Sequence, residues 1–186
     1  MSLARACAAV AAVVILAACT IAPQPSSNAA AQEAHAVVEA IYAPYLNRDT
    51  GVAASLVASA PWTNEFRSRI VELESLQLRV RDEVVVWGEL TFDPIIQSQE
   101  NYLYDVRANV RVGAPTINEA GVAIVEVRFG DVVMQYELVR EDGAWRVHNI
   151  RRDDWNLAAA VQHDLDEGRA YEECRRTHPA SQCTLD

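Results

Sequence analysis

Residues 122–150 read VAIVEVRFGDVVMQYELVREDGAWRVHNI, and this stretch decides the fold. Two runs rich in β-branched and aromatic residues, Val122–Phe129 and Val132–Arg140, are separated by Gly130-Asp131, a two-residue link typical of a β-hairpin. Glu141-Asp142-Gly143 then predicts a second turn into a third strand, Trp145–Ile150. Links this short join neighbouring antiparallel strands, so the stretch predicts an antiparallel meander.

Side chains along these strands alternate between the two faces of the predicted sheet. In the second strand, one face carries Met134, Tyr136 and Leu138, and the other carries Gln135, Glu137 and Val139. In the third strand, strict alternation places Arg146, His148 and Ile150 together, opposite Trp145, Val147 and Asn149. These sets predict which side chains can meet across the sheet.

Helical and extended segments flank the meander. Apolar residues at helical spacing predict helices over Ala30–Leu46 and from Pro61 to about Arg81. A short strand is predicted at 84–87, and strict alternation predicts another at 102–112. The order of helices, then strands, predicts an α+β fold with helices packed on one face of the sheet.

A last helix is predicted to open at residues 153–157 and to run to about Glu167. Asp154 is placed to cap its N-terminus, and Gly168 is predicted to end it. The folded part therefore forms one predicted domain, residues 32–170, followed by a tail of residues 171–186.

The first 18 residues have the pattern of a secretory signal. Arg5 precedes the apolar run Ala8–Ala18, which is shorter than the roughly 20 residues that span a bilayer. The alternative is a short buried helix, but a globular helix is rarely apolar all round. Residues 19–31, rich in Pro, Ser, Asn and Ala, are then predicted to be a flexible tether.

The end of this run, Leu16-Ala17-Ala18-Cys19, resembles the lipobox of bacterial lipoproteins. The resemblance implies that cleavage leaves Cys19 as the new N-terminus and that Cys19 carries fatty acyl chains such as palmitate. More than one acyl chain anchors a protein stably to a membrane. Thr20, in place of Asp, resembles the residue that directs such proteins to the outer membrane, facing the periplasm.

Net charge bears on the class of partner. The formal net charge is −10 at pH 7, with 26 acidic and 16 basic residues. Phosphate backbones are bound by basic surfaces, so the acidity argues against nucleic acid as a partner. It also argues against adhesion of the domain itself to anionic lipid.

Four cysteines are present, and the first two are not expected to form a disulfide in the folded domain. Cys7 leaves with the signal and Cys19 is assigned to lipid, so Cys174 and Cys183 remain in an oxidising compartment, where cysteines usually pair. The alternative is a metal site of Cys174, His178 and Cys183, with His163 as a fourth ligand. That spacing fits no standard zinc pattern, so a disulfide is favoured and no metal is predicted.

Three phrases resemble uncharacterised bacterial lipoproteins of the nuclear-transport-factor-2-like superfamily. They are FDPIIQSQE (Phe92–Glu100), the strand pair within Val122–Ile150, and DDWNLAAAVQHDL (Asp153–Leu165). Glu100 stands where that family usually has Asp, and the extension from Tyr171 lies outside its pattern. The resemblance implies a curved sheet wrapped around helices, forming a cone with an apolar pocket. The superfamily contains isomerases, dehydratases, hydrolases and proteins that only bind, so the fold does not choose the function.

A pocket enzyme would need a carboxylate or histidine inside the cone. The candidate pair is His148 with Glu126 or Glu137; the alternatives are a histidine on a wet strand face and cross-strand ion pairs formed by Glu126 and Arg128. Asp93, Gln97 and Glu100 form an unusual polar cluster, although capping of the turn before Pro94 is favoured for Asp93. The remaining acidic candidates near the sheet are Asp105 and Asp153.

The sequence contains no Gly-rich phosphate loop, no nucleophile elbow and no HExxH motif, so no cofactor is predicted. The favoured function is that of a lipid-anchored envelope protein that binds a small apolar ligand or a protein partner without catalysis. The alternatives are a cone-pocket enzyme that transfers protons through His148, and a purely structural envelope component.

Overall fold

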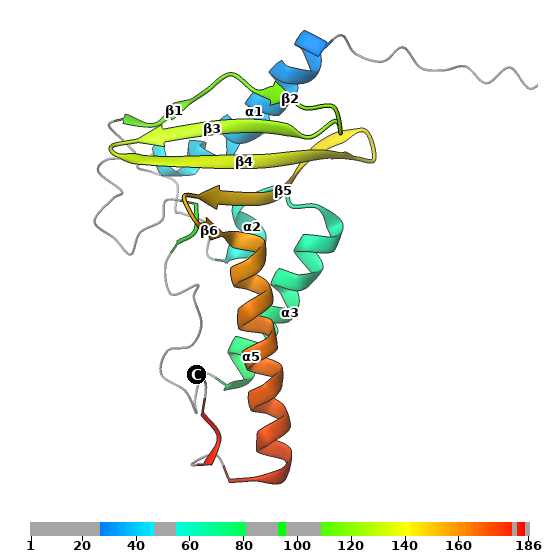
Figure 1. Cartoon of the computed structure of the whole chain (residues 1–186), viewed down its shortest axis with the longest axis vertical. Coiled ribbons are helices and arrows are strands. Elements are labelled where there is room, and N and C mark those ends of the chain that lie inside the picture. The colour runs from blue at the N-terminus through cyan, green and yellow to red at the C-terminus, as the bar shows by residue number, and fades with distance from the viewer. Residues whose placement is uncertain (1–26, 47–54, 81–92, 96–108, 180–181, 185–186) are drawn as a thin grey trace, which may run out of the picture.

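The computed structural model describes residues 27–46, 55–80, 93–95, 109–179 and 182–184. The predicted signal, Cys19, most of the tether and the strand predicted at 84–87 lie outside these residues, as do residues 102–108 of the strand predicted at 102–112 and the candidates Gln97, Glu100 and Asp105. Within them the fold is α+β, as predicted: helices pack against one open antiparallel sheet (Figure 1).

The sheet is built around the predicted meander. Its three long strands are β3 (Ala123–Phe129), β4 (Val132–Glu141) and β5 (Ala144–Arg152). The two short strands β1 (Arg111–Val112) and β2 (Thr116–Ile117) both pair with β3, and β6 (Trp155–Asn156) pairs with β5. All of these pairings are antiparallel, which confirms the predicted topology.

The turn between β4 and β5 follows from its two residues. Asp142 and Gly143 have φ values of 52° and 79°. Positive φ at both positions matches the twist of flanking strands, and Asp-Gly is among the sequences that adopt it most readily. The pair therefore fixes the hairpin that joins β4 to β5.

A β-bulge in β5 corrects the predicted faces of that strand. Glu137 pairs with Asn149 while Leu138 pairs with Val147, so His148 is an extra residue without a partner in β4. One extra residue reverses the alternation that follows it. Ile150 is therefore buried with Trp145 and Val147, not on the side of Arg146 as predicted.

Helix α1 (Ser27–Leu46) packs on the inner face of the sheet and begins before the predicted Ala30. Residues 27–31, predicted to belong to the tether, are thus helical. The start of α1 is fastened to the β4–β5 hairpin, because Trp145 Nε1 donates to the Ala30 carbonyl at 3.0 Å. The Arg140 guanidinium lies 4.8 Å from the centre of the Trp145 ring and also pairs with Glu33.

A short helix, α2 (Leu56–Ser59), precedes α3 (Asn64–Val80). The predicted start of α3 at Pro61 is too early, because Pro61 and Thr63 hydrogen-bond through their backbones to Val147 of β5. This bridge holds the start of α3 against the sheet.

Helix α5 (Leu157–Thr177) differs most from the prediction. Asn156, not Asp154, caps it, because the Asn156 side chain accepts a hydrogen bond from Ala159 N at 3.1 Å and β6 separates Asp154 from the helix. Gly168 does not end it but lies buried within it. A helical glycine costs about 1 kcal/mol relative to alanine, and packing of α5 along α3 offsets this, so the helix crosses the predicted domain boundary at residue 170.

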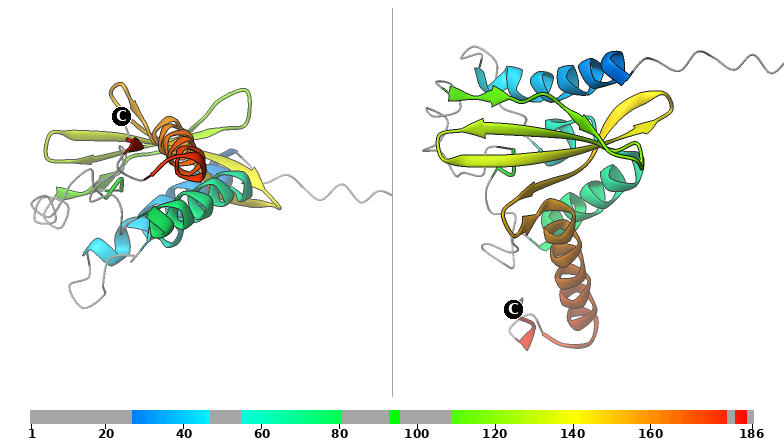
Figure 2. Two further views of the ribbon diagram at one scale, coloured as in Figure 1. Left: turned by 90° about the horizontal axis from the view of Figure 1, so that it is seen from below. Right: turned by 45° about the horizontal axis from the view of Figure 1, so that its top comes forward.

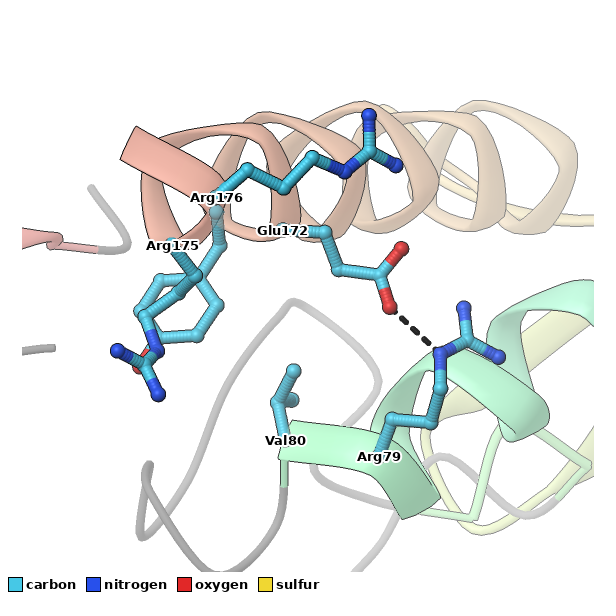
Figure 3. Close-up of a pocket in the computed structure, with 6 residues that line it drawn as sticks. Arg79, Val80, Glu172, Arg175 and Arg176 are labelled. Carbon is cyan, nitrogen blue, oxygen red and sulfur yellow. Dashed lines mark hydrogen bonds and ion pairs between the residues drawn. The ribbon is translucent and has the colours of Figure 1, made fainter. Parts of the chain in front are cut away.

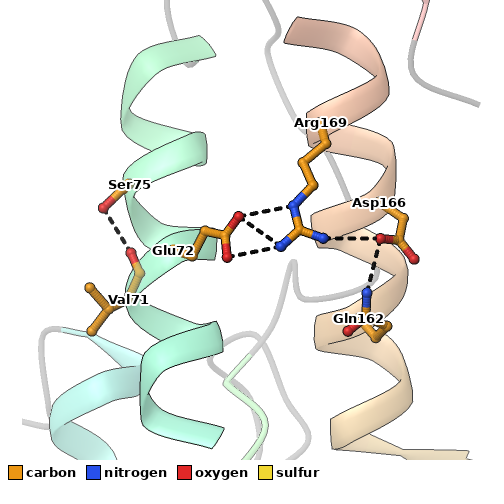
Figure 4. A network of polar contacts seen from close by, with 6 residues as sticks. All are labelled: Val71, Glu72, Ser75, Gln162, Asp166 and Arg169. Carbon is orange, nitrogen blue, oxygen red and sulfur yellow. Dashed lines mark hydrogen bonds and ion pairs between the residues drawn. The ribbon is translucent and has the colours of Figure 1, made fainter. Parts of the chain in front are cut away.

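The contact between α3 and α5 has an apolar interior and a charged margin. Arg169 of α5 binds both carboxylate oxygens of Glu72 of α3 at 2.9 Å (Figure 4). Asp166 and Gln162 extend this margin along α5. Among the helices of the described residues, none has both the length and the apolar character needed to cross a bilayer.

Candidate functional site

The inner face of the sheet carries a buried tyrosine cluster, which we define as Tyr42, Tyr45 and Tyr136 with Asp93. The Tyr42 hydroxyl donates to the Ile95 carbonyl at 3.0 Å and lies 2.8 Å from the Tyr136 hydroxyl. Tyr45 donates to Asp93 Oδ2 at 2.8 Å. The cluster therefore links α1, β4 and the 93–95 turn through side chains that the fold buries.

Burial sets the protonation state of these phenols. Desolvation raises the pKa of Tyr42 and that of Tyr136 well above the ordinary value for tyrosine. Burial also raises the pKa of Tyr45, and the neighbouring charge of Asp93 adds to that effect. All three side chains stay neutral at physiological pH, so none of them can act as a phenolate base.

Asp93 has the turn-capping role predicted for it. Its Oδ1 accepts a hydrogen bond from Ile95 N at 2.8 Å, the pattern of a side chain that stabilises its own turn. Its other oxygen is engaged by Tyr45. Both carboxylate oxygens of Asp93 are thus occupied by the protein, and the predicted partners Gln97 and Glu100 lie outside the described residues.

The predicted acid–base pair does not come together on the sheet. His148 is exposed at the bulge, and no hydrogen bond or ion pair joins it to Glu126 or Glu137 in the described part of the chain. Glu126 instead pairs with Arg128 on its own strand, not across strands as the alternative interpretation held, and Glu137 lies 3.3 Å from Arg151. This arrangement does not favour proton transfer through His148. Asp153, the other acidic candidate described, lies in a turn with φ of 48° and pairs with Arg152.

Asn149, next to His148, is a buried polar side chain whose amide is hydrogen-bonded through both its nitrogen and its oxygen. It is 4 % exposed, its Nδ2 donates to Glu137 Oε2 at 3.2 Å, and its Oδ1 accepts from Ala158 N at 3.1 Å. The side chain thereby joins β4 to the first turn of α5. The bulge is what turns Asn149 toward that helix.

Cys174 and Cys183 form a disulfide, with their Cα atoms 5.8 Å apart, as predicted. Bonded sulfurs are not available as thiolate ligands, so the alternative metal site at these residues is ruled out. His178, its third predicted ligand, instead contacts the Thr177 hydroxyl at 2.8 Å.

The predicted fourth ligand, His163, lies on α5 beside two carboxylates. Its Nδ1 is 3.7 Å from Asp164 Oδ1, and its Nε2 is 3.7 Å from Glu167 Oε1. The two carboxylates thus lie near opposite ring nitrogens. One ligand atom from each of the three residues lies within 4.8 Å of the other two, a clustering that exposed acidic groups often show without a metal.

A cleft lies where the C-terminal ends of α3 and α5 meet, and we call it the helix-tip cleft. Its volume is about 300 Å³. The residues that line it are Arg79, Val80, Tyr171, Glu172, Arg175 and Arg176 (Figure 3). Val80 and Tyr171 are buried, and the charged side chains surround them. The cleft therefore combines an apolar floor with an arginine-rich rim.

Within the cleft, Arg79 already forms an ion pair with the carboxylate of Glu172. Arg79 Nε lies 2.5 Å from Glu172 Oε1. That hydrogen bond lowers the pKa of Glu172 below its ordinary value of 4.5. Arg176 pairs with Glu173, which does not line the cleft.

A second hollow of about 300 Å³ lies on the outer face of the sheet. Its lining residues are Val133, Gln135, Arg151, Arg152 and Asp153. Both of its arginines contact carboxylates, Arg151 with Glu137 and Arg152 with Asp153. It has no buried apolar floor, because Val133 is only half-buried.

No protein-family model matches the chain, and no curated protein is significantly similar to it.

The helix-tip cleft was not predicted from the sequence. Its arginines on α5 were placed in the tail, because Gly168 was predicted to end the helix. The adjacent Arg175-Arg176 pair was the available signal, since basic residues favour the last turn of a helix. Tyr136, by contrast, lies on the face of its strand that the sequence predicts, with Met134 and Leu138.

Proposed function

We propose that this chain is a lipid-anchored protein of the cell envelope, held to the outer membrane on its periplasmic side by acyl chains on Cys19. Its domain binds a small ligand or a protein partner and does not catalyse a reaction. The observation that carries the proposal is the Cys174–Cys183 disulfide, because such bonds persist mainly outside the cytoplasm. The lipobox-like Leu16-Ala17-Ala18-Cys19 supports the same compartment independently.

We also propose that the fold is of the nuclear-transport-factor-2-like type. Support comes from the way α1 lies in the inner face of the sheet, with Tyr42 against Tyr136 and Phe129. Figure 2 shows α1 crossing one side of the sheet while α3 and α5 extend from it together. In a cone of this type the inner face lines the interior.

The non-catalytic role is supported by the state of the candidate groups. The tyrosine cluster keeps its protons, and both oxygens of Asp93 are engaged. His148 is exposed to solvent and pairs with neither Glu126 nor Glu137 in the described part of the chain. General acid–base catalysis needs a titratable group placed within reach of the substrate and tuned toward neutral pH. None of the candidates within the described residues combines these properties.

The anchor is tested by a matched pair of cysteine variants in the producing cell. Cys19→Ser removes the proposed lipid attachment, and we expect the protein to move from the membrane fraction to the soluble fraction. Cys7→Ser is the control, because Cys7 lies in the proposed signal and leaves with it. A Cys19→Ser protein that still fractionates with membranes would overturn the proposed anchor.

A further inference from the structure

We propose that helix α3 pairs with α3 of a second copy of this chain, as a short antiparallel coiled coil. The inference names a partner for the proposed binding role, and it rests on that role. The surface involved is the side of α3 that faces away from α5, with Val71 at its centre (Figure 4).

This outward side of α3 has the residue spacing of a coiled coil. Five residues recur there at intervals of four and three, and we call them the α3 seam: Asn64, Ser68, Val71, Ser75 and Leu78. A period of 3.5 residues keeps side chains on one line along a helix, where a second helix can pack. At 1.5 Å per residue the seam covers about 21 Å of α3.

The α3 seam is uncharged and open to solvent. Leu78 is 64 % exposed and Val71 is 46 % exposed, which makes them the exposed large apolar residues of α3. The hydroxyls of Ser68 and Ser75 donate to carbonyls of their own helix, Asn64 O at 2.9 Å and Val71 O at 2.7 Å. Because these hydroxyls already have acceptors, a second helix can cover them at little polar cost.

Two charged side chains on one flank of the seam remain available for a partner. Arg67 is exposed, and no hydrogen bond or ion pair engages its guanidinium within the described part of the chain. Glu74 is half-buried, and its Oε1 accepts from Val57 N at 3.1 Å, which leaves Oε2 for a cation. On the other flank, Glu72 and Arg79 already pair with residues of α5.

Arg67 and Glu74 indicate both the orientation and the identity of the partner. Residues on the same flank of two antiparallel helices lie opposite each other, so a two-fold axis beside Val71 sets Arg67 of each copy against Glu74 of the other. The midpoint of Arg67 and Glu74 and the midpoint of the seam both fall at residues 70–71. One axis therefore satisfies both. In a parallel pair, Arg67 would face Glu72, which Arg169 already holds.

The length of the seam predicts a weak contact. It has only two strongly apolar residues, Val71 and Leu78, so we expect little association in dilute solution. Copies anchored in one membrane are confined to a thin layer, which raises their effective concentration. The proposed anchor thus supplies the condition under which such a seam associates.

The test is disulfide crosslinking of Val71→Cys in membranes of the producing cell. The two-fold axis places the two copies of residue 71 side by side, where their Cβ atoms can approach to the roughly 4 Å that a disulfide requires. We expect a reducible dimer of this chain. Glu65→Cys is the matched control on the same helix, because Glu65 is exposed but its two copies would lie about 18 Å apart along the axis of α3.

Three results would overturn the proposal. The first is the absence of a reducible dimer from Val71→Cys. The second is equal crosslinking of Glu65→Cys, which would show random collision. The third is crosslinking of Val71→Cys to a protein of different mass, which would show that another partner covers the seam.

Charge reversal tests the antiparallel orientation in the Val71→Cys protein. Arg67→Glu and Glu74→Arg each set like charges opposite each other, so we expect each to lower the dimer fraction several-fold, since exposed pairs contribute about 0.2–1 kcal/mol each. The double variant exchanges the two charges and should restore the dimer. Arg67→Glu keeps the test decisive if Glu74→Arg disturbs the Val57 contact. No loss with Arg67→Glu, or no restoration in the double variant, would contradict the pairing.

The outcome is separable from that of the anchor. Release of the Cys19→Ser protein from membranes does not depend on α3. Crosslinking of Val71→Cys in the purified, concentrated Cys19→Ser protein tests the seam without the lipid, and a dimer there supports the seam whatever holds the chain in the cell. Absence of a dimer both there and in membranes overturns the seam and leaves the anchor unaffected.

Discussion

The hydroxyl oxygen of Tyr42 lies 2.8 Å from that of Tyr136, at the buried contact between α1 and β4. Tyr42 donates its own proton to the Ile95 carbonyl, so its oxygen accepts the proton of Tyr136. The chain of donors runs from the sheet through the helix to the 93–95 turn. Buried hydroxyls that are fully paired stabilise a unique arrangement, whereas an unpaired one is costly.

The direction of these hydrogen bonds predicts that Tyr42→Phe destabilises the protein more than Tyr136→Phe does. Tyr136→Phe removes a donor and leaves Tyr42 bonded to Ile95, so we expect a loss of about 1 kcal/mol. Tyr42→Phe leaves both the Ile95 carbonyl and the Tyr136 hydroxyl without their partner, so we expect a loss of about 1–3 kcal/mol. Urea denaturation of both variants measures the difference. The double variant should be no less stable than Tyr42→Phe, and a strictly additive loss would contradict the shared network.

The bulge predicts opposite behaviour for two neighbouring residues. Asn149→Ala leaves the Ala158 N–H and the Glu137 carboxylate without the Asn149 amide, so we expect a loss of about 1–3 kcal/mol in the free energy of unfolding. His148→Ala changes an exposed side chain and should stay within about 0.5 kcal/mol of the parent protein. Thermal or urea unfolding of the two variants checks this. A loss for His148→Ala as large as that for Asn149→Ala would contradict the exposed position of His148.

Glu172 predicts a pH dependence of definite sign. Its pKa in the folded protein is lowered by the Arg79 hydrogen bond, so its contribution to stability is present above its ordinary pKa of 4.5 and is lost as pH falls through the lower folded value. NMR titration of the Glu172 side-chain carbon should show this low pKa. Arg79→Gln should return the pKa toward 4.5, and an unchanged value would argue that the ion pair does not exist in solution.

The disulfide predicts the reactivity of the tail. Thiol labelling of the denatured, unreduced mature protein should leave Cys174 and Cys183 unlabelled, and prior reduction should expose both. The chain-entropy relation gives roughly 2.6 kcal/mol for a loop of this length. Labelling of both residues without reduction would contradict the bond. Cys183→Ser provides the control, because it should free Cys174 for labelling.

The strands could be predicted because their signals are local. Gly130-Asp131 and Asp142-Gly143 specify two-residue turns, and the alternation along β4 specifies its faces. The Asp93 turn was equally local, since the side chain bonds the backbone two residues further on.

The errors came from tertiary contacts that a local pattern does not contain. Gly168 is a poor helix former, but the packing of α5 on α3 carries the helix through it. The insertion of His148 depends on how β5 pairs with β4, and no residue type in β5 marks it. The helix-tip cleft depends on both helix ends at once, so it could not be seen until α5 had its full length.

The most direct test of the lipid anchor is the intact mass and N-terminal residue of the mature protein extracted from membranes. We expect a chain that begins at Cys19 and carries acyl chains. Its mass should fall when mild alkali hydrolyses ester-linked acyl chains, and fragmentation should locate that change at the first residue. A membrane-extracted chain that begins at Met1, or one that begins at Cys19 without lipid, would contradict the account.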